Sequence, residues 1–135
     1  MNRITPEHIE ELKDTEVFVF GSNEDGIHGG GAAKLTHQKW KALWGYGVGM
    51  LSQQTYGIPT KKNPNVVLPL EKIKKYVDDF IIFAKMNQSK HFYVTKIGCG
   101  LANYEPKDIA PLFKNAVDIK NISLPQCFWD ILNYK

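Results

Sequence analysis

The residues best suited to chemistry lie in a polar, glycine-rich stretch between Gly21 and Ala33, which reads G-S-N-E-D-G-I-H-G-G-G-A-A. Ser22 and Asn23 supply a hydroxyl and an amide, and the triple glycine Gly29-Gly30-Gly31 leaves backbone N–H groups open to a ligand. A glycine-rich loop that leads into a helix aims such N–H groups at one point, which suits a phosphate. The alternative is a tight turn in which the glycines serve only the backbone geometry.

The same stretch contains the candidate catalytic residues, Asn23 and His28. Hydrolysis of a bound ligand would need a positioned water and a general base. His28 is the best candidate for that base because histidine titrates near neutral pH. Glu24 and Asp25 are weaker candidates. The alternative for His28 is a loop histidine bonded to the backbone, and for the two acids it is turn-forming surface charge.

A second glycine-rich segment, Gly98-Cys99-Gly100-Leu101, follows the apolar run that ends at Ile97. Cys99 is expected to pack rather than to act as a nucleophile, because no partner histidine is assigned to it. The chain's other cysteine, Cys127, forms no zinc-binding spacing with Cys99, so no metal site and no cofactor are predicted.

Two apolar strands must position these loops. Val17–Phe20 is apolar on both faces, which is typical of a strand covered by helices on both sides. The second strand is predicted over residues 91–97, with its core stretch at Phe92–Ile97, and each strand leads through a glycine loop into a helix. We therefore predict a three-layer α/β/α sandwich with a mixed central sheet, in which these strands are central neighbours. If they are parallel, their loops converge at one edge of the sheet.

The remaining elements follow from caps, prolines and apolar spacing. Thr5-Pro6 predicts a short helix, and Pro59 predicts that the strand Gln53–Thr60 is an edge strand or ends there. Pro111 favours Asp108 over Pro106 as the start of a later helix. Glycines alternate in W-G-Y-G-V-G, residues 44–49, so this segment is either a close-approach surface for a backbone or flat ligand, or a flexible loop. The other predictions are helices over Gly31–Leu43 and Glu71–Met86, a strand over Asn121–Leu124, and a C-terminal turn or helix.

Composition places the chain among ordinary globular proteins. With 135 residues, 43% hydrophobic and 23% charged, it is predicted to form one domain over residues 1–135. A formal net charge of +3 permits an anionic ligand without calling for nucleic acid. No apolar run approaches membrane-spanning length, and no signal peptide is evident. Free thiols are expected, and with them a cytoplasmic location.

The order of these motifs resembles the macrodomains, the modules that bind ADP-ribose. The shared features are a core strand, then S-N and a G-G-G loop, the T-Y-G-I-P strand, a long helix, and F-Y-V-T-K-I-G-C-G-L before another helix. The resemblance is closer still to small bacterial and phage macrodomain-like proteins with V-F-G-S-N and Y-x-I-P-T segments. It covers residues 16–125.

The resemblance implies that Asn23 faces the distal ribose and that Gly29, Gly30 and Gly31 pass along that ribose and the diphosphate. Gly98, Cys99, Gly100 and Leu101 match the second phosphate loop, and Ser22 accompanies Asn23 in the expected ligand-binding set. Macrodomains also carry an early Gly-Asp-Ile segment whose aspartate reads adenine, and residues before Glu16 include no such segment. The ligand is therefore ADP-ribose, another nucleotide or a smaller ribose phosphate.

Three functions follow from this interpretation. The first is a binder of ADP-ribose or a related nucleotide that also hydrolyses an ADP-ribosyl or phosphate linkage. The second is a binding module without turnover, whose partner is the free ligand or an ADP-ribosylated protein. The third is a protein-interaction scaffold that has lost ligand binding, which the intact glycine loops disfavour.

Overall fold

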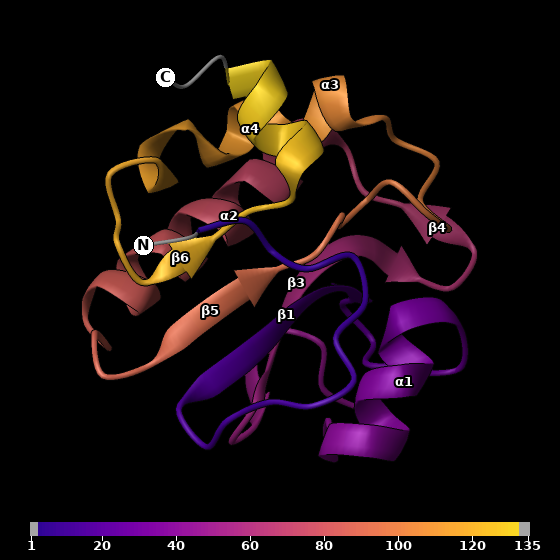
Figure 1. Ribbon diagram of the computed structural model, residues 1–135. Helices are drawn as coiled ribbons and strands as arrows, with labels where there is room; N and C mark the ends of the chain where they lie inside the picture. Colours follow the sequence, from indigo (N-terminus) through magenta and orange to yellow (C-terminus); the bar gives the residue numbers. More distant parts are fainter. Residues whose placement is uncertain (1–2, 133–135) are drawn as a thin grey trace.

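One mixed β-sheet organises the part of the chain that the computed structural model describes, residues 3–132 (Figure 1). Its strands are β1 (Glu16–Asn23), β2 (Gly49–Ser52), β3 (Thr55–Asn63), β4 (Val66–Val67), β5 (His91–Val94) and β6 (Ile122–Ser123). They lie in the order β2-β3-β1-β5-β6, with β4 paired to β3 off this path. The pairs β1–β3, β1–β5 and β5–β6 are parallel, whereas β2 and β4 pair antiparallel with β3.

The side chains of β1 alternate between two cores, one on each face of the sheet. Val17 and Val19 belong to the larger core, and Phe18 and Phe20 belong to the smaller one. Helix α1 (Gly31–Trp40) covers the smaller core, and α2 (Leu70–Lys85) covers the larger one. Helices therefore cover both faces of the sheet, and the predicted α/β/α sandwich with a mixed sheet is confirmed.

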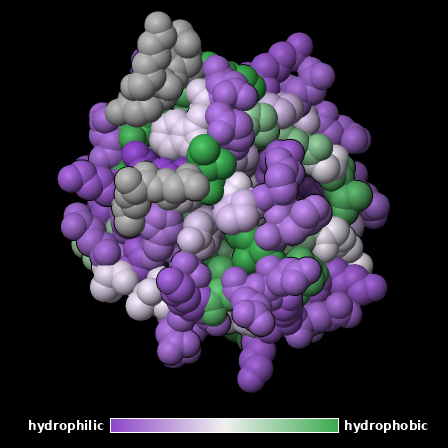
Figure 2. All heavy atoms as spheres, viewed as in Figure 1, coloured by the Kyte–Doolittle hydropathy of each residue, from purple (hydrophilic) through white to green (hydrophobic). Residues whose placement is uncertain are grey.

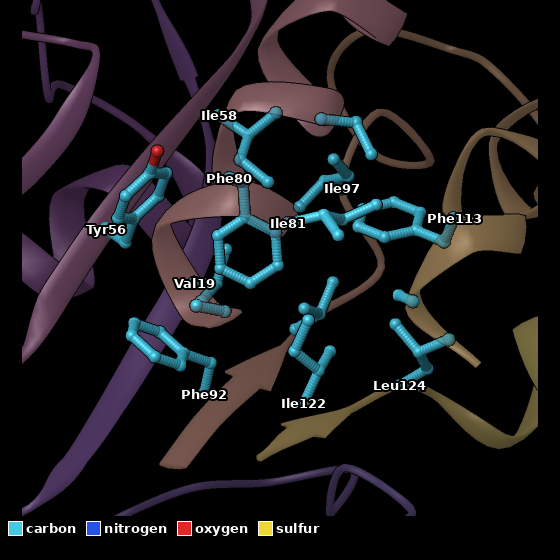
Figure 3. Close-up of a cluster of buried hydrophobic side chains, with 14 of the residues drawn as sticks. Val19, Tyr56, Ile58, Phe80, Ile81, Phe92, Ile97, Phe113, Ile122 and Leu124 are labelled. Carbon is cyan, nitrogen blue, oxygen red and sulfur yellow. The ribbon is translucent and has the colours of Figure 1, made fainter. Parts of the chain in front are cut away.

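The larger core also receives the C-terminal part of the described chain (Figure 3). Helix α2 presents the apolar stripe predicted from its three-four spacing, and Ile73, Val77 and Phe80 on that stripe are fully buried. Three short helical segments complete this layer: α3 (Pro106–Ile109), the 3-10 helix η1 (Ala110–Ala116) and α4 (Gln126–Leu132).

The two apolar strands predicted as central neighbours are paired in the sheet. Residue Val17 of β1 lies opposite Phe92 of β5, and Val19 lies opposite Val94. Their bounds differ from the prediction, because β1 continues beyond Phe20 to Asn23 and β5 ends at Val94. The extension of β1 follows from its pairing with β3, which continues to the end of the strand.

The prediction that the strand carrying Pro59 is an edge strand or ends there is wrong, because β3 is internal and continues to Asn63. Strand β3 is internal, with β1 on one side and antiparallel partners on the other. On that second side, β2 pairs with Tyr56 and Gly57, whereas β4 pairs with Lys61 and Asn63. Pro59 falls in the gap between the two partners, so neither antiparallel pairing needs the N–H that proline lacks.

Two predicted helix starts are also wrong. The later helix begins at Pro106 rather than after Asp108, and the Asp108 carboxylate accepts a hydrogen bond from the Glu105 backbone N–H at 3.0 Å. The conflict with Pro111 is avoided because the chain changes to a 3-10 helix at Ala110. Residues around Thr5 form no helix. Instead, the Thr5 N–H donates to the Leu124 carbonyl beside β6 at 2.9 Å.

The surface seen in Figure 2 is mainly hydrophilic, with hydrophobic side chains in separate small areas. Over residues 3–132, no helix has the length and apolar character needed to cross a membrane. In the same range, no cluster of three or more histidine, cysteine or acidic residues is arranged to hold a metal ion.

Candidate functional site

A cleft with a volume of about 730 Å³ opens where β1 and β5 end. The end of β1, the first glycine loop (residues 24–30) and the start of α1 supply one side, and the second glycine loop (residues 98–101) supplies the other. The predicted ligand-binding residues that line the cleft are Ser22, Asn23, Gly29, Gly30, Gly31, Gly98, Gly100 and Leu101. Cys99 is the predicted binding residue that does not line it. The topology therefore brings together two loops that are distant in sequence, because parallel neighbouring strands end at the same edge.

Asn23 shapes the first glycine loop with its side chain. Its Nδ2 donates to the Ile27 carbonyl at 2.8 Å, and its Oδ1 accepts from the Ile27 N–H at 2.9 Å. This pair of bonds closes the turn that contains Gly26, whose φ of 71° is in the left-handed region. An amide has a second N–H and a second lone pair, so Asn23 retains one donor and one acceptor for a ligand.

The residues that begin α1 line the cleft. The first N–H groups of a helix have no acceptor within the helix, and here they belong to Gly31, Ala32 and Ala33, which all line the cleft. Gly30 precedes them in an extended conformation with φ of −154°. A Cβ added at Gly30 would lie 3.6 Å from the Leu101 Cδ1, so the two loops face each other across a short distance.

The second glycine loop turns away from the sheet at Gly98. Its φ is 75°, and an added Cβ would lie 2.9 Å from the Ile109 Cδ1, so both conformation and space require glycine there. Burial raises the pKa of the Cys99 thiol to about 11, and its Sγ contacts the Ile97 carbonyl at 3.5 Å. A thiol with so high a pKa is a poor nucleophile at neutral pH, in agreement with the predicted packing role.

The cleft lining includes two lysines that were not among the site residues predicted from the sequence. Lys61 comes from the part of β3 beyond Thr60, where the predicted strand ended, and its Nζ donates to the Pro64 carbonyl at 3.0 Å. Lys96 follows β5 and forms an ion pair with Glu7 at 3.4 Å. Recognition of β3 as a third parallel strand would have found Lys61, because β3 then ends at the same edge as β1 and β5.

The three candidate bases lie outside the cleft lining. His28 is 1% exposed, and its Nε2 lies 2.8 Å from the Leu43 carbonyl. Glu24 accepts a hydrogen bond from the Tyr76 hydroxyl and pairs with Lys72 at 3.0 Å. The Tyr76 hydrogen bond, with help from Lys72, lowers the pKa of the Glu24 carboxyl. This placement does not support the expectation that His28, Glu24 or Asp25 acts directly on a ligand in the cleft.

The glycine-alternating segment, residues 44–49, is a close-approach surface for backbone. A Cβ on Gly47 would lie 1.7 Å from the Asn23 carbonyl oxygen, and a Cβ on Gly26 would lie 2.0 Å from the Tyr46 nitrogen. The Gly45 N–H also donates to the Gly26 carbonyl at 2.9 Å. Of the two interpretations of this segment, the structure supports close approach, and the neighbour is the backbone of the first glycine loop.

The protein is similar to known proteins in its structure, whereas its sequence matches none of those compared. No protein-family model matches the sequence, and no curated protein matches it. Among solved structures, the macrodomain of Mycobacterium tuberculosis DarG has a TM-score of 0.64 at 18% identity, covering 90% of this chain and 96% of that one. Thermosipho africanus DarTG in complex with ADP-ribose has a TM-score of 0.59 at 17% identity, over 83% of this chain. This chain spans 37% of the DarTG chain.

A third similar structure is a protein of unknown function from Bacteroides thetaiotaomicron. Its TM-score is 0.55 at 14% identity, and the match covers 82% of this chain and 86% of that one. The sheet order, the two glycine loops and these likenesses together define the class. The protein has an α/β macrodomain-like fold.

Proposed function

We propose that the protein binds ADP-ribose, or a related nucleotide or ribose phosphate, in the cleft between its two glycine loops. The observation that carries this proposal is the composition of the cleft lining. Among residues 3–132, both glycine loops and the first turn of α1 line the cleft, Lys61 and Lys96 are the charged residues of its lining, and no lining residue is an aspartate or a glutamate. N–H groups at the start of a helix, with the Lys61 ammonium nearby, suit a diphosphate.

The similarity to DarTG in complex with ADP-ribose supports the same ligand class. In the proposed complex, the N–H groups of the first turn of α1 donate to the diphosphate oxygens, and Lys61 balances part of its charge. Asn23 uses its remaining donor and acceptor on ribose hydroxyls. The glycines keep both sides of the cleft free of side chains, so that the ligand can reach the backbone.

The cleft lining supports binding more directly than hydrolysis. Acid–base hydrolysis usually relies on a carboxylate or an imidazole within hydrogen-bond reach of the reacting group. Within the described part of the chain, no aspartate, glutamate or histidine lines the cleft, and the amide of Asn23 is no base. We therefore propose a binding module as the primary function, with free ADP-ribose or an ADP-ribosylated protein as its partner.

Calorimetric titration with ADP-ribose, ADP, NAD and ribose 5-phosphate in parallel tests this proposal. We expect ADP-ribose to bind, and we expect a Lys61→Gln variant to bind it more weakly. Lys85→Gln is the matched control, because Lys85 is exposed at the C-terminal end of α2 and does not line the cleft. Absence of binding to all four compounds would refute the proposal.

A second assay separates binding from turnover. The protein is incubated with a mono-ADP-ribosylated protein, and released ADP-ribose is measured over time. We expect retention of the modified protein without release. If the parent protein releases ADP-ribose and the Lys61→Gln variant does not, the protein is a hydrolase and the proposal of a binding module without turnover is wrong.

A further inference from the structure

His28 is a buried polar residue for which the cleft itself provides no role. It directly precedes Gly29, the first residue of the triple glycine, yet its ring is only 1% exposed and does not line the cleft. The Leu43 carbonyl can only accept a hydrogen bond, so the His28 Nε2 at 2.8 Å must carry the proton and donate it. The Nδ1 atom is buried and has no hydrogen-bond partner among residues 3–132.

The His28 hydrogen bond joins the two ends of α1. His28 lies just before the helix, whereas Leu43 lies just after it, beyond the left-handed C-cap residue Lys41. The Leu43 N–H in turn donates to the Leu51 carbonyl of β2 at 2.9 Å. The first glycine loop is thereby connected through one side chain to the segment that follows α1, and from there to the sheet.

Three rings pack around the His28 imidazole, and one of them is His37, at a centroid distance of 6.1 Å. The Phe20 ring of β1 meets the His28 ring edge-on at a centroid distance of 5.8 Å, and the Trp44 ring meets it edge-on at 5.8 Å. Phe20 is fully buried in β1, so the His28 ring packs against a side chain that is itself held by the core. The position, direction and hydrogen bond of His28 are therefore set on each side before any ligand arrives.

We propose that His28 is a positioning residue that fixes the first glycine loop in its ligand-binding conformation through its hydrogen bond to Leu43. This inference rests on the proposed function, because it concerns the same cleft. The triple glycine has no side chains whose contacts could fix its conformation, and an added Cβ at Gly29 would meet nothing within 4 Å. Glycine also has the largest conformational freedom to lose on ordering. An anchor immediately before Gly29 supplies the order that the glycines lack.

The test compares His28→Phe with His28→Gln. Phenylalanine retains the ring between Phe20 and Trp44 but removes the donor to Leu43, whereas glutamine retains an N–H donor on a chain of similar reach. We expect His28→Phe to weaken ADP-ribose binding about tenfold, which corresponds to about 1.4 kcal/mol and to the loss of one hydrogen bond. We expect His28→Gln to restore most of the affinity. Both variants should keep their melting temperature within a few degrees of the parent.

Amide hydrogen exchange of the ligand-free protein provides a readout that does not depend on the ligand. We expect residues 29–33 to exchange about tenfold faster in His28→Phe, because the loop opens more often, while the strands of the sheet retain their protection. His37→Phe is the matched control. The ring of His37 lies in the same cluster, 6.1 Å from the His28 ring and 5.2 Å from the Trp44 ring, but its Nδ1 lies 2.7 Å from the Ala42 carbonyl at the end of α1, so this variant removes a different hydrogen bond.

The outcomes separate the two proposals. If wild-type protein binds no ADP-ribose, the proposed function fails, and exchange at residues 29–33 still decides the role of His28. Parent-like exchange and affinity in His28→Phe would overturn the positioning role. An equal effect of His37→Phe on residues 29–33 would overturn it as well, because general packing around Trp44 would then explain the result.

Discussion

Replacing Gly30 by valine tests whether the triple glycine serves a ligand or only a turn. Gly30 has an extended backbone with φ of −154°, which any residue can adopt. A Cβ at this position would lie 3.6 Å from the Leu101 Cδ1, an ordinary van der Waals contact, and would meet no other atom within 4 Å. The folded protein should therefore accept valine at Gly30 with little loss of stability.

The ligand should not accept it. The valine side chain would fill the space between the first glycine loop and Leu101, where the proposed diphosphate approaches the backbone. A hydrogen bond between a backbone N–H and a charged phosphate oxygen contributes about 1.5–3 kcal/mol. Loss of two such bonds would weaken binding by about two to four orders of magnitude, at about 1.4 kcal/mol per tenfold change.

The assay is calorimetric titration of the parent, Gly30→Val and Gly30→Ala with ADP-ribose, after thermal unfolding has been compared for all three. Alanine adds one methyl group and should cause a smaller loss of affinity than valine. Asn23→Ala is also expected to cost less than Gly30→Val, because it leaves the backbone N–H groups in place. A parent-like dissociation constant for Gly30→Val would refute this reasoning, because the glycines would then be required only for the turn.

Three further predictions concern the second loop, the cleft charge and acid stability. Gly98→Ala should lower the free energy of unfolding in urea by about 1–2 kcal/mol, because φ of 75° is left-handed and the new Cβ would meet Ile109. Unchanged stability would contradict this geometry. Lys61→Gln should weaken ADP-ribose binding and flatten its dependence on salt, measured by titration from low to high ionic strength. The Tyr76 hydrogen bond lowers the pKa of Glu24, so its stabilising effect should be present above pH 4.5 and decline as pH falls through the lowered pKa. Tyr76→Phe should reduce that decline in urea unfolding measured from pH 7 to pH 3, and an identical decline would exclude this contribution.

Much of the fold could be predicted from the sequence because its signals are local. Four consecutive β-branched or aromatic residues, Val17–Phe20, indicate a strand buried on both faces, and the structure places two of them in each core. The three-four spacing of α2 likewise fixes its buried stripe. Glycine loops after both apolar strands were enough to predict neighbouring strands, which the pairing of β1 and β5 confirms.

The errors fall where a residue depends on a partner from elsewhere in the chain. Pro59 indicates an edge strand only if one partner strand pairs along the whole of each side of β3. On one side the partner changes from β2 to β4, and this change is not visible in the local sequence. Thr5 resembles a helix cap, but its N–H is used by the Leu124 carbonyl, far away in sequence. Pro111 argues against a start at Pro106 only if one regular α-helix runs through it, whereas the chain changes to a 3-10 helix just before it.

The candidate site divides in the same way. Its glycines and Asn23 are evident from the sequence, because a loop that must admit a ligand to its backbone is rich in small residues. The position of Lys61 depends on β3 lying parallel to β1, and the burial of His28 depends on Phe20 below it and Trp44 beside it. Residue types and spacing therefore determined which glycine-rich loops follow the two core strands. Only the tertiary structure decided which charges face the cleft and which polar side chain supports the loop from behind, because both depend on contacts between distant segments.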